Sequence, residues 1–133
     1  MKLGSLKEGG RDGTLIVVSP DMSRAARAHG IASTLQQALE NWREAEEQLR
    51  QLHEALIEHR ADGSFELDPG DLASPLPRAF QFLDGSAYLA HVERVRRARG
   101  AEMPPSFLTD PLMYQAVSDG FHPPAGTITS SIW

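Results

Sequence analysis

An apolar stripe in the first half of the chain constrains its fold more than any other feature. Seven apolar residues recur at alternating spacings of three and four: Leu35, Ala38, Trp42, Ala45, Leu49, Leu52 and Leu56. This spacing is typical of one face of an α-helix. Ser33 or Thr34 is the expected N-cap, because Gln36 and Gln37 lie three residues downstream of them, as a capping box requires. We therefore predict one helix over residues 34–60.

The stripe also repeats every seven residues, which is the pattern of a coiled coil formed with another chain. A single helix that covers a small sheet needs the same inward face. Leu39 lies beside the stripe and widens it toward the pattern of a globular core. We favour the globular interpretation. The opposite face of this helix is charged, which indicates solvent exposure.

Two segments before the helix have the pattern of a β-hairpin. Residues 2–7 alternate in polarity, residues 14–19 are β-branched and aliphatic, and the turn formers of residues 8–13 lie between them. The sheet of this hairpin is the surface against which the helix can bury its stripe, so Trp42 is expected inside. Residues 20–32 fit either a third short strand or a helical turn. The expected fold class is α+β.

A connector follows the helix. Residues 61–77 are rich in Asp, Gly, Ser and Pro, and one short extended piece is expected at residues 65–67. The prolines near its end disfavour a helix, so residues 78–82 are expected to be extended. We place the domain boundary here, which gives an N-terminal α+β domain at 1–78 and a second segment at 79–133.

A second helix is predicted from about Ser86 to Arg99, with Asp84-Gly85 as the turn before it and Gly100 as its cap. The proline-rich stretch that follows is not expected to be helical.

The second helix carries the residues with the most chemical potential. At about 100° per residue, five of them share one face: Tyr88, His91, Val92, Val95 and Arg99. A histidine among valines is more often a core or boundary residue than part of a site. Here it stands with a guanidinium that can pair a carboxylate and with a phenol, and an imidazole can act as a proton acceptor near neutral pH. These neighbours indicate half of a site for an anionic substrate.

Composition excludes several classes of function. Eighteen acidic and 13 basic residues give a net charge of −5, which argues against nucleic-acid and membrane partners. The absence of cysteine excludes disulfide scaffolds, thiolate nucleophiles and thiolate zinc sites. The sequence has no signal-peptide core and no run of about 18 apolar residues, so we expect a cytoplasmic protein. It also lacks a glycine-rich phosphate loop and a Gly-x-Ser-x-Gly motif.

Several stretches are specific enough to indicate a relationship. Three lie in the second half of the chain: Asp84-Gly85-Ser86-Ala87-Tyr88-Leu89-Ala90-His91-Val92-Glu93, Arg97-Ala98-Arg99-Gly100-Ala101-Glu102-Met103-Pro104 and Thr109-Asp110-Pro111-Leu112-Met113-Tyr114-Gln115. They resemble the segment that joins the two domains in a bacterial branch of the fumarylacetoacetate hydrolase family. Met1-Lys2-Leu3, Arg11-Asp12-Gly13 and residues 32–42 resemble the N-terminal domain of that branch.

The resemblance implies an activity and roles for particular residues. Members of the family cleave carbon–carbon bonds in β-diketo acids, or decarboxylate, hydrate or isomerise related oxo acids, at a Mg²⁺, Mn²⁺ or Ca²⁺ centre. His91 would be the general base that activates water. Arg99 and Tyr114 would contact substrate carboxylate or carbonyl oxygens, and Tyr88 is added to this substrate site from its place on the helix face. Asp84 matches a metal-binding aspartate, although Asp-Gly-Ser is also a good turn and helix cap, which we favour.

The sequence also departs from the family pattern. Some relatives have a glutamate partner three residues after the histidine, where this chain has Arg94. The main metal ligands of the family are a Glu-x-Glu pair and a further acidic residue in a C-terminal domain, and hard cations need several such oxygen ligands. We therefore expect a truncated N-terminal portion, inactive alone and without a cofactor of its own, since Mg²⁺ or Mn²⁺ belongs to the complete enzyme.

The expected partners follow from this interpretation. A small oxo acid would be a substrate only if the catalytic half is supplied. Apolar residues of the 100–133 segment, including Phe107, Met113, Ile132 and Trp133, would lack a partner in this chain, so we predict a homo-oligomer whose contacts draw on that segment. The alternative to a family enzyme fragment is a non-catalytic oligomerisation or protein-binding module.

Overall fold

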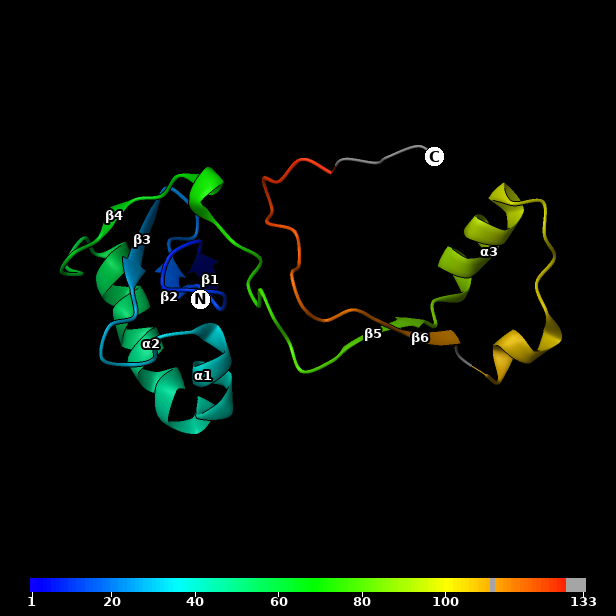
Figure 1. The fold of residues 1–133 in the computed structure, drawn as a ribbon, viewed down its shortest axis with the longest axis horizontal. Coiled ribbons are helices and arrows are strands. Elements are labelled where there is room, and N and C mark those ends of the chain that lie inside the picture. The colour runs from blue at the N-terminus through cyan, green and yellow to red at the C-terminus, as the bar shows by residue number, and fades with distance from the viewer. Residues whose placement is uncertain (111, 129–133) are drawn as a thin grey trace. The chain divides into compact units, whose positions relative to one another are not determined.

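A four-stranded antiparallel sheet forms the centre of the first half of the chain (Figure 1). Its order is β1 (Lys2–Leu6), β2 (Thr14–Val18), β3 (Arg24–Arg27) and β4 (Phe65–Glu66). The predicted hairpin is confirmed as the β1–β2 pair. Residues 20–32, for which the sequence fitted either a strand or a helical turn, contain the strand β3. The short extended piece expected in the connector is β4. The α+β fold class is confirmed.

The computed structural model describes residues 1–110 and 112–128. The chain divides into two compact units. Among the described residues, the first unit comprises residues 1–79 and 119–128, and the second unit comprises residues 80–110 and 112–118. Ile132 and Trp133, which were expected at an oligomer contact, lie outside the described residues.

The stripe is helical, but the prediction of one continuous helix is wrong. The chain forms α1 (Leu35–Glu40) and α2 (Trp42–Ile57), separated at Asn41. The side-chain amide and the backbone N–H of Asn41 both donate to the carbonyl of Gln37, at 3.1 and 3.2 Å. A side chain that bonds the local backbone in this way competes with the regular helical pattern, which explains the interruption.

The predicted cap of α1 is confirmed at Thr34. Its hydroxyl accepts a hydrogen bond from the backbone N–H of Gln37 at 3.1 Å. The side-chain oxygen of Gln37 accepts one in return from the backbone N–H of Ser33 at 2.8 Å. These two bonds satisfy N–H groups at a helix start that have no partner within the helix.

The sheet is buried on both faces, because alternate residues of β2 point to opposite sides. One face packs against both helices in a cluster that includes Leu15, Val17, Ala38, Ala45, Leu49 and Leu56. The other face is covered by the connector, in a cluster of Leu6, Ile16, Val18, Ala25, Leu67 and Leu72. Trp42 packs against the first cluster but is only half-buried, so its expected position inside is met in part.

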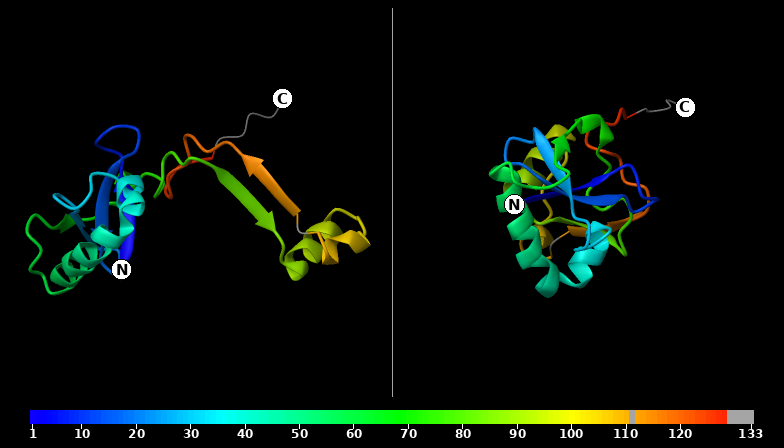
Figure 2. Two further views of the ribbon diagram at one scale, coloured as in Figure 1. Left: turned by 90° about the horizontal axis from the view of Figure 1, so that it is seen from below. Right: turned by 90° about the vertical axis from the view of Figure 1, so that its left-hand side faces the viewer.

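The regular elements of the second unit are two strands and one α-helix, which Figure 2 shows. β5 (Phe82–Ser86) pairs with β6 (Leu112–Ala116) in antiparallel register, and α3 (Leu89–Ala98) lies between them in sequence. The proline-rich stretch forms only a short 3₁₀ turn at Pro105–Leu108. Gly100 follows the end of α3 with a φ of 66°, as expected of a glycine after a helix.

Two local predictions for this unit are wrong. The Asp84-Gly85 pair is not a turn but part of β5, and α3 begins at Leu89 instead of Ser86. β6 was not predicted. A strand far along the sequence pairs with the residues expected to turn, so a long-range contact decides their conformation over the local turn preference.

Two ion pairs bind the residues that come just before and just after the second unit in the sequence. Arg78, just before this unit, donates to both carboxylate oxygens of Asp12 in the β1–β2 turn, at 2.7 and 2.5 Å. Arg11, the neighbouring turn residue, donates to both oxygens of Asp119 at 2.8 and 2.6 Å. The hydrogen bond from Arg78 is the main reason why the pKa of Asp12 is lowered. The β1–β2 turn therefore binds the chain both before and after residues 80–118.

The packing of α2 predicts a pH dependence of stability. The Nδ1 atom of His53 is buried and has no hydrogen-bond partner among the described residues. Burial, with the nearby N-terminal ammonium, lowers the pKa of His53 below its usual 6.5. On acidification the unfolded chain then takes up this proton before the folded chain does. Stability should be fully present above the unfolded-state pKa and should fall as the pH drops through the folded-state pKa.

Thermal unfolding between about pH 7.5 and about pH 5 tests this dependence. We expect the melting temperature of the unaltered chain to fall on acidification and that of His53→Gln to fall less. The other four histidines are exposed and are common to both proteins. Equal slopes in the two proteins would contradict the prediction.

Candidate functional site

A hollow of about 360 Å³ lies within the second unit, between α3 and β6. Its lining residues are His91, Val92, Val95, Arg96, Arg99, Ala101, Leu112 and Tyr114, and we call it the α3 hollow. The helical repeat explains its helix side, since residues three, four and eight positions apart share one face. The α3 region and one strand, β6, thus converge on one concave surface.

Three of the residues proposed from the sequence lie together in this lining. His91 comes from the first turn of α3, Arg99 follows the last residue of α3, and Tyr114 comes from the middle of β6. His91 and Arg99 are exposed, and the side chain of Tyr114 is 53% exposed. The sequence spacing could place His91 and Arg99 on one helix face. Tyr114 joins them only because β6 pairs with β5.

Tyr88 does not line the α3 hollow. The prediction that it shares the helical face with His91 is wrong, because α3 begins at Leu89 and Tyr88 is the N-cap with extended backbone angles. Its side chain is 84% exposed. The helical projection therefore does not apply to this residue.

Asp84 is held by Tyr114. The two residues are directly opposite each other in the β5–β6 register, and the Tyr114 hydroxyl donates to the Oδ2 atom of Asp84 at 2.7 Å. The preferred interpretation of Asp84 as a turn and helix cap is wrong, because it lies inside β5 and α3 has no side-chain cap hydrogen bond. Asp84 as a whole residue is half-buried.

The donor set does not fit the divalent metal that the resemblance implies. Within residues 1–110 and 112–128, no three His, Asp or Glu side chains stand close enough to hold a metal ion together. Asp84 alone cannot supply the several oxygen ligands that Mg²⁺ or Mn²⁺ requires.

The charge of the α3 hollow suits an anion. Its lining contains the guanidinium groups of Arg96 and Arg99 and no carboxylate. Arg96 is half-buried, and its Nη1 atom donates to the carbonyl of Glu102 at 3.0 Å, which holds this side chain beside the hollow. Arg96 was not predicted from the sequence, although it lies three residues before Arg99 and so about one turn away on the same side of the helix.

Apolar side chains complete the α3 hollow. Val92 is 5% exposed, and Val95 and Leu112 also line it. A surface with cationic groups beside apolar ones fits a small organic anion better than an inorganic one, because the carbon skeleton finds apolar contact while the guanidinium groups pair the charge.

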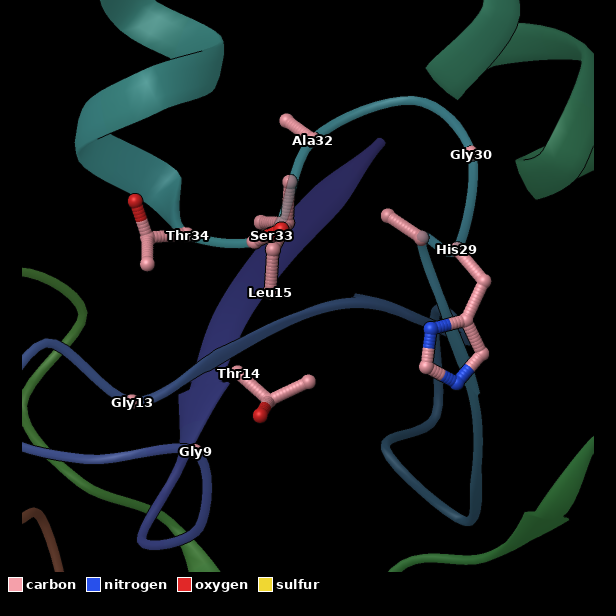
Figure 3. A pocket seen from close by; sticks show the side chains of 10 residues that line it. Gly9, Gly13, Thr14, Leu15, His29, Gly30, Ala32, Ser33 and Thr34 are labelled. Atoms are coloured by element: carbon pink, nitrogen blue, oxygen red, sulfur yellow. The ribbon is translucent and has the colours of Figure 1, made fainter.

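A second polar hollow in the first unit is less suited to a ligand (Figure 3). Thr34 and His29 stand on opposite sides of it, and Thr14 lies between. Two of its hydroxyl groups are already engaged locally: the Thr14 hydroxyl donates to the carbonyl of Glu8, and the Thr34 hydroxyl caps α1. The α3 hollow is therefore the candidate functional site.

Comparison with known proteins assigns the first unit. Residues 1–78 match the family described as fumarylacetoacetase N-terminal domain 2, and this match covers more than half of the chain. It spans the four-stranded sheet and both of its helices but ends before the α3 hollow. No curated protein matches the chain. Among the described residues, no helix is long and apolar enough to cross a membrane.

Proposed function

The chain belongs to the fumarylacetoacetase family through its N-terminal domain, and from this premise we propose that the α3 hollow binds the carboxylate of a small oxo acid. The chain would contribute substrate-binding and proton-accepting residues to the chemistry of that family, without a metal site of its own. His91, Arg99 and Tyr114 carry these roles.

The observation that supports the proposal most is the meeting of three side chains from two elements. His91 and Arg99 come from the α3 region and Tyr114 from β6, and all three line the same hollow. A guanidinium pairs a carboxylate through two parallel hydrogen bonds, which fixes the orientation of the acid. An imidazole can accept a proton from water, and this is the role proposed for His91.

The binding of acetylpyruvate tests the proposed site. Addition of this acid should shift the backbone NMR signals of residues 91–101 and 112–116. Arg99→Met should weaken binding by roughly tenfold or more, because it removes a charge-assisted hydrogen bond and keeps an apolar stem of similar length. Arg94→Met is the matched control, since Arg94 is exposed on α3 and does not line the hollow. Equal losses in both variants would rule out a specific carboxylate site.

The absence of a suitable carboxylate set predicts the behaviour of the isolated chain with metals. We expect no measurable hydrolysis of acylpyruvates with added Mg²⁺ or Mn²⁺, because the described residues have no group of three potential ligands. Calorimetry should show no tight site for either ion. A submicromolar dissociation constant for either metal would contradict this expectation.

A second candidate function, self-association, is favoured by the exposed apolar residues of the second unit. All five residues of β6 are exposed, with Met113 at 65%, and Val117 just beyond the strand is 78% exposed. An isolated pair of strands is marginally stable in water, and exposed apolar side chains on such a pair gain stability when another surface covers them. Two-fold pairing with a second copy is the simplest such cover.

Sedimentation equilibrium at micromolar concentration tests self-association. We expect a mass above the 14.6 kDa of the single chain. Met113→Glu should return the protein to that mass, since a buried charge in an apolar contact is unfavourable. Leu39→Glu, at a position 46% exposed in the first unit, is the control and should leave the mass unchanged. A clean single-chain mass for the unaltered protein would contradict the prediction.

A further inference from the structure

The hydrogen bond between Tyr114 and Asp84 determines what the α3 hollow offers to a ligand. A tyrosine hydroxyl has one proton to donate, and its oxygen can also accept. In this structure the proton points to the Oδ2 atom of Asp84 at 2.7 Å. An ionised carboxylate has no proton to give, so the direction of this bond is fixed.

The strand pairing keeps this bond in place. Asp84 and Tyr114 are directly opposite each other in the β5–β6 register, where side chains of neighbouring strands point to the same face. Asp84 is half-buried, while its neighbours Leu83 and Gly85 are exposed. Asp84 does not line the α3 hollow itself, whereas Tyr114 does. Asp84 therefore acts on a ligand through the tyrosine.

We propose that Tyr114, with its proton committed to Asp84, accepts a hydrogen bond from a ligand hydroxyl, so that the α3 hollow selects hydroxy acids or the enol form of oxo acids. Asp84 is a positioning residue in this arrangement and not a metal ligand. The inference rests on the proposed function, because it assumes that the hollow binds a carboxylate.

The chemistry of the lining supports this selection. Arg96 and Arg99 only donate hydrogen bonds, so they pair the carboxylate of the ligand and cannot accept from its hydroxyl. A carbonyl oxygen placed against the Tyr114 oxygen would meet a second acceptor, which is unfavourable. A hydroxyl or an enol O–H at the same place satisfies the tyrosine oxygen. Besides Tyr114, His91 is the residue of the lining whose side chain can accept a hydrogen bond.

Lactate and pyruvate form a matched pair of probes, because they share the carboxylate and the three-carbon skeleton and differ in the hydroxyl or carbonyl at the second carbon. Their affinities are measured by NMR titration of the signals of residues 91–101 and 112–116. We expect lactate to bind the unaltered chain roughly threefold to tenfold more tightly than pyruvate, the effect of one hydrogen bond.

Two variants separate the role of Tyr114 from that of His91. Tyr114→Phe removes the acceptor and should abolish the preference for lactate. Asp84→Ala frees the tyrosine proton for a ligand carbonyl, so the preference should disappear or reverse in favour of pyruvate. If Asp84→Ala fails to fold, as judged by the dispersion of its NMR signals, Tyr114→Phe still decides the question.

The outcomes distinguish this inference from the proposed function. If neither acid binds the unaltered chain, the proposed carboxylate site fails, and the inference fails with it. If both acids bind with equal affinity, or if pyruvate binds more tightly, the carboxylate site stands and the inference is overturned. A preference for lactate that survives in Tyr114→Phe also overturns it, because the hydroxyl then bonds to another group such as His91.

Discussion

The burial of β2 on both of its faces is the constraint on which the first unit depends. Leu15, Ile16 and Val17 are fully buried, although they point alternately to opposite sides of the sheet. A strand of this kind needs two separate covers. The helices provide one through their apolar stripe, and the connector provides the other through Leu67 and Leu72. The connector, despite its loop-like composition, is therefore as necessary to the core as the helices.

Sequence patterns predicted those parts of the fold in which local preference and burial agree. The hairpin alternates and ends in turn formers, and the stripe has a helical period, so both were found. Asn41 interrupts the helix through a bond between its side chain and the carbonyl of Gln37, which the stripe does not reveal because the apolar spacing continues across it. β6 was missed for a different reason. All five of its residues are exposed, so no alternation of burial marks it, and its partner β5 lies far away in sequence.

The same distinction applies to the candidate site. His91 and Arg99 were identified from helical spacing and from the resemblance to the family, and both line the α3 hollow. Tyr88 was expected inside the helix, but the helix begins at Leu89, three residues after the predicted start at Ser86, so the helical projection does not apply to Tyr88. The bond between Tyr114 and Asp84 depends on the register of two strands, which a single sequence without a recognised β6 cannot supply. Arg96 could have been predicted from the sequence, since its spacing of three residues from Arg99 places both on one side of the helix.

The ion pairs of the β1–β2 turn have a consequence for how this architecture changes over evolution. Arg11 and Asp12 hold Asp119 and Arg78, so the two points between which residues 80–118 are inserted stay next to each other, as the pairing of Arg78 with Asp119 also shows. Closing a loop whose ends are already adjacent costs little additional chain entropy when its length changes. Segments of different length and chemistry can then be exchanged at this position while the sheet and its two covers keep their sequence and their fold.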